Sequence, residues 1–268
     1  MKKLLLIATA ASLLALTSCL DTEEKISINN DDSGSYTLTM DMGQLLTFAK
    51  TMGAGKDKEG KLPEKKDSII YFKGIVDTST VLTVQEKEML RNGTLHIKLD
   101  EEAAEMKFVI NLPFKNISGL PYLKENFMAA MDKIKVMDKV DPTKKQNPDG
   151  ESTGEEIPAE NKPSSKSLNP MQSAYTFSAV KGKISNKLTD RSAFDNLVKN
   201  DSSLQMMQQL TGMMGEMKYR TVIVLPKAAK SFKGNNAEAS ADKKTITFKN
   251  SLTDMMGKAE AAEYEVEY

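Results

Sequence analysis

Apolar and polar residues alternate with a period of two in several stretches of the chain, which predicts β-strands with one buried face. Residues 25–42 alternate on both sides of an Asn/Asp/Ser/Gly cluster, so we expect a hairpin whose turn needs Gly34 for a positive φ. Residues 94–99 and 106–112 alternate around a polar turn and predict a second hairpin. Shorter stretches predict further strands over 175–180, 219–225, 245–248 and 263–268.

Other stretches carry apolar residues at the spacing of one helix face. Thr83 and Glu86 stand at the spacing of a capping box, which marks the start of one such helix. The pattern of residues 67–75 is compatible with either a strand or a helix. The predicted helices cover 44–52, 83–91, 120–137 and 189–217. Together these patterns predict an α+β fold, in which antiparallel β-hairpins form a sheet with helices packed on one face.

The predicted fold is interrupted by residues 138–172. This stretch has five prolines, many charged and amide side chains, and almost no apolar residues. Because it cannot bury enough apolar surface to offset the entropy of ordering, we expect a disordered insertion. It divides the expected domain into a first part, residues 25–137, and a second part, residues 173–268.

The N-terminus has two lysines, an apolar run from Leu4 onward, and the sequence Leu16-Thr17-Ser18-Cys19. This arrangement resembles a bacterial lipoprotein signal peptide with its lipobox. The resemblance implies that residues 1–18 are removed and that Cys19, the lipidation site, receives a diacylglycerol and fatty acyl chains such as palmitate. The run is shorter than the ~20 apolar residues of a membrane span. An ordinary secretory peptide cleaved elsewhere is the alternative.

The residues after the lipobox, Leu20-Asp21-Thr22-Glu23-Glu24, include three acids. We expect an acidic lipid tether over residues 19–24. The same residues also resemble the export signal of surface lipoproteins in Bacteroidetes. We therefore expect a cell-envelope protein held in the outer membrane by the lipid on Cys19, facing either the periplasm or the cell surface.

Composition excludes several function classes. The chain has 37 basic and 37 acidic residues, and removal of the two signal lysines leaves 35 against 37. A net charge near −2 gives no electrostatic case for nucleic-acid binding. Cys19 is the only cysteine, so the fold has no disulfide and must be stabilised by its core.

The sequence offers no catalytic constellation. His96 is the only histidine, and alternation places it on the polar side of its strand, without a cysteine or second histidine to share a metal. The pattern Gly-x-Ser-x-Gly occurs at residues 150–154, but these residues belong to the proline-rich stretch 138–172 and do not join a predicted strand to a predicted helix, as a nucleophile elbow requires. An envelope hydrolase that uses carboxylates remains an alternative, because the chain has several groups of acidic residues. Examples are Glu101-Glu102 and the outward row Glu263, Glu265 and Glu267. We predict no catalytic, metal-binding or cofactor-binding residue.

Seventeen methionines raise a second alternative, a periplasmic copper-handling protein, because thioethers are soft ligands. Most of these methionines fall on apolar faces, where methionine fills irregular cores. Four fall off those faces or near helix ends and are candidates for an adaptable binding surface: Met206, Met213, Met255 and Met256. In the helix predicted over 189–217, the residues expected on the apolar face are Phe194, Leu197, Val198, Leu204, Met207, Leu210, Met214 and Met217.

The early hairpin Ile-x-Ile-x-x-x-x-Ser-Gly-x-Tyr and the late strand Tyr-Arg-Thr-Val-Ile-Val-Leu-Pro resemble uncharacterised lipoproteins of Bacteroidetes. More distantly, the chain is similar to the folded domain of LppM-type lipoproteins. The likeness covers about residues 24–52 and 175–268 and carries over no catalytic residue. It implies a lipid-anchored, non-enzymatic envelope protein that binds an unknown protein or an apolar ligand.

Overall fold

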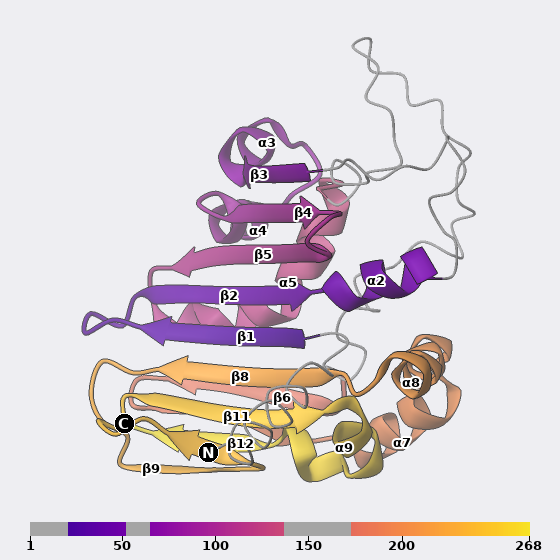
Figure 1. The fold of residues 1–268 in the computed structure, drawn as a ribbon. Coiled ribbons are helices and arrows are strands. Elements are labelled where there is room, and N and C mark those ends of the chain that lie inside the picture. Colours follow the sequence, from indigo (N-terminus) through magenta and orange to yellow (C-terminus); the bar gives the residue numbers. More distant parts are fainter. Residues whose placement is uncertain (1–20, 52–64, 137–172) are drawn as a thin grey trace, which may run out of the picture.

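A computed structural model describes residues 21–51, 65–136 and 173–268, which form two β-sheets and a set of helices (Figure 1). In the larger sheet the strand order is β10-β11-β8-β1-β2-β5-β4-β3, and in the smaller sheet it is β6-β7-β12-β9. The α+β class predicted from the sequence is confirmed. The strands of the larger sheet are β1 (Asp21–Ile28), β2 (Gly34–Asp41), β3 (Lys65–Tyr71), β4 (Thr94–Asp100), β5 (Glu105–Phe114), β8 (Lys218–Val224), β10 (Ala237–Ala239) and β11 (Thr245–Ser251).

Both predicted hairpins are present, as β1–β2 and β4–β5. The predicted role of Gly34 is wrong: the left-handed backbone position in the first turn belongs to Asp32, with φ of 64°. Gly34 is needed for a different reason. A Cβ atom at this position would lie 1.9 Å from the carbonyl oxygen of Ser27, so only glycine permits the close approach of β1 and β2.

The parallel pairing of β1 with β8 joins the two halves of the chain. Asp21 lies opposite Lys218, and the register continues to Ser27 opposite Val224. Buried residues from both halves, such as Ile26 and Ile223, belong to one hydrophobic cluster. The residues before and after the expected insertion therefore build one domain around a shared sheet.

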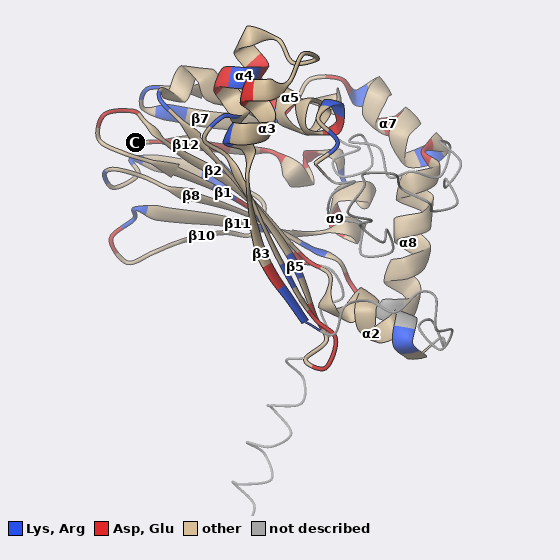
Figure 2. Cartoon of the chain, turned by 90° about the horizontal axis from the view of Figure 1, so that it is seen from above, with Lys and Arg blue, Asp and Glu red and all other residues tan. Residues whose placement is uncertain are grey.

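The smaller sheet and one long helix from the first part of the chain, α5, cover the same face of the larger sheet (Figures 1 and 2). Helix α5 (Leu120–Lys133) is preceded by the 3-10 turn η1 (Ile117–Gly119). Phe248 of β11 stacks on Tyr264 of the smaller sheet with ring centroids 4.9 Å apart. As predicted, Tyr264, Val266 and Tyr268 are buried. The smaller sheet consists of β6 (Tyr175–Val180), β7 (Lys183–Leu188), β9 (Ser231–Gly234) and β12 (Tyr264–Glu267).

The helix predicted over 189–217 is wrong in its extent, because the structure has two helices there. Asp201 adopts an extended conformation, ends the first helix, and caps the second by accepting a hydrogen bond from the Leu204 backbone N–H. Met217, expected on the helical stripe, lies just before β8 and is buried beside Phe194. The two helices are α7 (Arg191–Asn200) and α8 (Ser202–Met214).

Helices α2 and α4 follow the sequence patterns closely, the helix predicted over 120–137 ends as α5 at Lys133, and α9 was not predicted. The predicted capping box of Thr83 and Glu86 is confirmed at the start of α4. The undecided stretch 67–75 is divided between the end of β3 and the start of α3. The helices are α2 (Gly43–Thr51), α3 (Phe72–Thr78), α4 (Val84–Leu90) and α9 (Leu252–Gly257), with a 3-10 turn η5 (Ala259–Ala262).

Several predictions concern residues outside the described ranges. These are the signal peptide 1–18, the lipidation site Cys19, and the expected disordered insertion 138–172, which all stay predictions. The expected acidic tether over 19–24 is too long, because residues 21–24 belong to β1. Among the described helices, none is long and apolar enough to cross a membrane.

Candidate functional site

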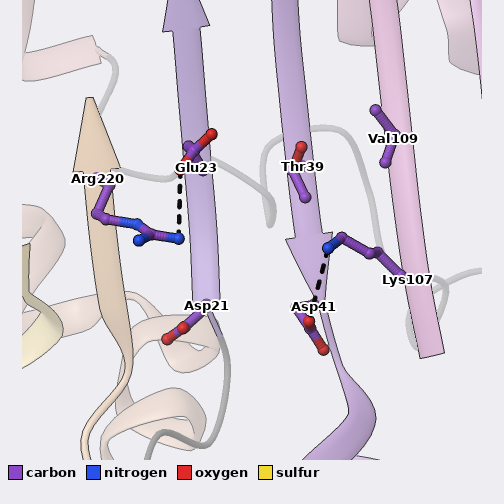
Figure 3. Close-up of a pocket in the computed structure, with 7 residues that line it drawn as sticks. All are labelled: Asp21, Glu23, Thr39, Asp41, Lys107, Val109 and Arg220. Atoms are coloured by element: carbon purple, nitrogen blue, oxygen red, sulfur yellow. Dashed lines mark ion pairs between the residues drawn. The ribbon is translucent and has the colours of Figure 1, made fainter. Parts of the chain in front are cut away.

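The outer face of the larger sheet carries a polar hollow with a volume of about 320 Å³. It lies over the central strands β8, β1, β2 and β5 (Figure 3), on the face opposite to α5 and the smaller sheet (Figures 1 and 2). Strand alternation builds the hollow, because every second side chain of these strands points away from the core. Its lining residues are Asp21, Glu23, Thr39, Asp41, Lys107, Val109 and Arg220.

The strand register arranges these side chains in two rows. In one row, Glu23 lies opposite Arg220 on β8 and Thr39 on β2. The Arg220 Nη2 atom is 3.2 Å from the Glu23 Oε2 atom, which forms an ion pair across β8 and β1 (Figure 3). This row therefore has its positive charge at the β8 side of the hollow.

In the other row, Asp21 of β1 lies opposite Asp41 of β2 in the strand register, and the Asp21 side chain is directed toward the β8 side of the hollow (Figure 3). Lys107 lies opposite Asp41 on β5, and its Nζ atom forms an ion pair with the Asp41 Oδ2 atom at 4.0 Å (Figure 3). The centre of the hollow is therefore acidic and its two sides are basic.

The two adjacent glutamates of the acidic run serve opposite faces of the sheet. Glu23 lines the hollow, whereas Glu24 points inward and forms an ion pair of 2.5 Å with Lys124 of α5. Lys124 also lies over the ring of Phe177, 4.1 Å from its centroid. This pair was not predicted from the sequence. The available signal was alternation, because Glu24 has the same parity as the buried Ile26.

The buried ion pair affects nearby tyrosines. Burial raises the pKa of Tyr36 well above its ordinary value, and the negative charge of Glu24 and a hydrogen bond to it raise this pKa further. Burial also raises the pKa of Tyr264 well above its ordinary value, again with a contribution from Glu24. Both phenols therefore stay protonated, and the cluster acts as a structural connection between the sheets and α5.

His96 lies on the outer face, and its Nε2 atom is 2.6 Å from the Asp67 Oδ1 atom. This hydrogen bond lowers the pKa of Asp67. Ser68 follows Asp67 on β3, but alternation places it on the opposite face of the strand. The His96–Asp67 pair therefore lacks an adjacent serine nucleophile from β3.

The glutamates of β12 form a surface network. Lys183 lies 3.1 Å from Glu265 and 2.9 Å from Glu267, and Lys187 lies 3.2 Å from Glu265. Hydrogen bonds from these two lysines lower the pKa of Glu265. Glu263 accepts a hydrogen bond from a backbone N–H of β7. These carboxylates thus act as cross-strand partners within the smaller sheet.

The candidate methionines separate into two groups. Met206 and Met213 are 60% and 63% exposed on α8. Met255 and Met256 are partly buried and pack against the hydrophobic cluster of α7, α8 and α9. In the described ranges, no group of three or more His, Cys, Asp or Glu side chains is arranged to hold a metal ion.

No protein-family model matches the chain, and no curated protein matches it either. Among solved structures, the folded domain of LppM from Mycobacterium tuberculosis, determined by NMR, is similar over 94% of this chain and 91% of that domain. The TM-score is 0.35 and the sequence identity is 8%. At these values the likeness establishes neither a common fold nor a common function.

Proposed function

We propose that this chain is a lipid-anchored protein of the cell envelope that acts as a non-enzymatic binding module, with the hollow on the larger sheet as its binding site. The observation that supports this site is the gathering of three carboxylates, Asp21, Glu23 and Asp41, between the basic side chains of Lys107 and Arg220. A positively charged group of a partner would add a further favourable contact to these carboxylates, beside the ion pair that Asp41 makes with Lys107. The hollow therefore suits a partner that presents a lysine or arginine side chain better than an apolar ligand.

The form of the hollow favours binding over catalysis. Its charged side chains are partly exposed to solvent: Glu23 is 30% exposed and Arg220 is 47% exposed. Electrostatic catalysis needs preorganised groups in a site from which water is excluded. An open site of paired charges contributes specificity and association rate instead.

The lipid anchor in this proposal is Cys19, which follows the lipobox residues Leu16, Thr17 and Ser18. Acyl chains contribute about 0.8 kcal/mol per buried CH₂ group, so two or three chains hold a protein firmly in a membrane. The Cys19→Ala variant should lose labelling by a fatty-acid analogue and should leave the membrane fraction. Labelling that persists in this variant would contradict the anchor.

The binding site can be tested by photo-crosslinking in intact cells. A photoreactive residue in place of Thr39 lies within the hollow, and one in place of Ser178, exposed on β6, provides the matched control. We expect a discrete adduct from position 39 that disappears in the Asp41→Lys variant, because the new ammonium occupies the acidic centre. Equal adducts from both positions, or an adduct insensitive to Asp41→Lys, would contradict the proposed site.

A further inference from the structure

Helix α8 has an unusual surface for an exposed helix. Its sequence, SSLQMMQQLTGMM, contains no acidic or basic residue. Leu204 is buried in the hydrophobic cluster, and Met207 and Leu210 pack against the same cluster. Met206 and Met213 are instead 60% and 63% exposed. They are seven residues apart, which is close to two helical turns, so they lie on one outward face.

This helix lies at the end of the larger sheet where β1 begins. The last residue of α8, Met214, is followed four positions later by Lys218, which lies opposite Asp21 at the first residue of β1. Figure 1 shows α8 and α2 together at this end of the sheet, and the two helices are in contact.

Connectivity places the same end of the sheet at the lipid anchor. Two residues span at most about 7 Å, so Asp21 must lie within that distance of an acylated Cys19. Cys19 in turn lies at the boundary between acyl chains and headgroups, since its lipids are in the bilayer. The opposite end of β1, at Ile28, is about 23 Å farther along the strand.

We propose that α8 lies on the membrane that carries the anchor, with Met206 and Met213 in the interfacial layer of the phospholipid bilayer. The inference rests on the proposed anchoring at Cys19. An uncharged helix face avoids the cost of bringing ionised side chains into the interface, and flexible methionine side chains adapt to it. Because the anchor supplies a high effective concentration, this small apolar area suffices as a second contact. The contact orients the sheet and its hollow relative to the membrane.

The contact can be measured with single introduced thiols in the full-length lipidated protein. The lipid occupies the sulfur of Cys19, so Met206→Cys and Met213→Cys each create one reactive site for an environment-sensitive fluorophore. Val180→Cys is the matched control, because Val180 is also exposed and apolar. The neighbouring Lys181 pairs with Asp32 in the β1–β2 turn at 2.8 Å, so this control lies at the opposite end of the sheet.

Each labelled protein is reconstituted into phosphatidylcholine vesicles with and without lipids brominated near the glycerol end of their acyl chains. We expect a blue-shifted emission that is quenched by the brominated lipid at positions 206 and 213, and no quenching at position 180. Unchanged melting temperatures of the three variants serve as the folding control, because all three positions are exposed.

Anchoring is measured separately, by flotation of the protein together with the vesicles. A protein that floats but shows no quenching at 206 and 213 would overturn the membrane contact and leave the anchor intact. A protein that does not float would overturn the anchor as well. In the unlipidated Cys19→Ala background, an emission shift that occurs without vesicles and grows with protein concentration would show that a second copy covers α8, which also overturns the inference.

Discussion

The ion pair between Glu24 and Lys124 allows a direct test of how this fold is held together. Only 17% of the Glu24 side chain and 11% of the Lys124 side chain are exposed, so both charges are largely removed from water. The Lys124→Met variant removes the ammonium, and with it the cation–π contact with Phe177, and leaves the Glu24 carboxylate without its cation. Breaking a buried ion pair from one side typically costs about 3–5 kcal/mol, because the remaining charge stays desolvated.

An exposed ion pair of the same length provides the control. Lys249 lies 2.6 Å from Glu238 across β11 and β10, but these side chains are 48% and 63% exposed. Because solvent screens this pair, Lys249→Met should cost at most about 1 kcal/mol. The comparison separates the effect of burial from the effect of removing a lysine.

The assay is chemical denaturation of both single variants and of the double variant Glu24→Met with Lys124→Met. The double variant should recover most of the stability lost in Lys124→Met, since it has no unpaired buried charge. If Lys124→Met costs no more than Lys249→Met, the Glu24 carboxylate is solvated and the reasoning fails. If the double variant is as unstable as the single variant, packing rather than charge causes the loss.

Three further predictions follow from named contacts. A hydrogen bond from Lys133 lowers the pKa of Glu86, so this carboxylate stabilises the fold above its unfolded pKa, and the effect is lost as pH falls through the lowered pKa of the folded state. Denaturation of the Glu86→Gln variant should therefore show a loss of stability at neutral pH that shrinks steadily as the solution is made more acidic. Leu204→Ala, at a buried position, should cost about 2–5 kcal/mol, whereas Met206→Ala, on the exposed face of the same helix, should change the unfolding free energy by less than about 0.5 kcal/mol. Gly34→Ala should lower the melting temperature, because its Cβ would meet the backbone of β1, and an unchanged melting temperature would contradict that close approach.

Alternation along the chain correctly predicted the central hairpins, because the burial of every second side chain is a local property of a strand. The capping box at Thr83 was predicted for the same reason, since both of its partners lie within four residues. The break at Asp201 was missed. A helical stripe continues through two consecutive helices, and the pattern does not show that an aspartate side chain starts a new helix within it.

The candidate site depended on contacts between distant segments. Alternation places Asp21 and Asp41 on one face of their strands, but the turn sets the register that makes them direct neighbours. Arg220 reaches Glu23 only because β8, nearly 200 residues later, pairs in parallel with β1. Local patterns cannot specify such pairings, because many strands of similar hydrophobicity compete for the same edge.

The sequence by itself therefore determined the central hairpins and most of the longer helices, which side of the alternating strands is buried, and where a lipid anchor is expected. The tertiary structure decided which strands are neighbours, and thus divided one acidic run between an outer hollow and a buried ion pair. It also decided that the exposed methionines of α8 lie at the end of the sheet where β1 begins. The physical reason is that apolar periodicity reflects burial against any core, whereas charged sites require particular partners that only the complete packing brings within a few ångströms.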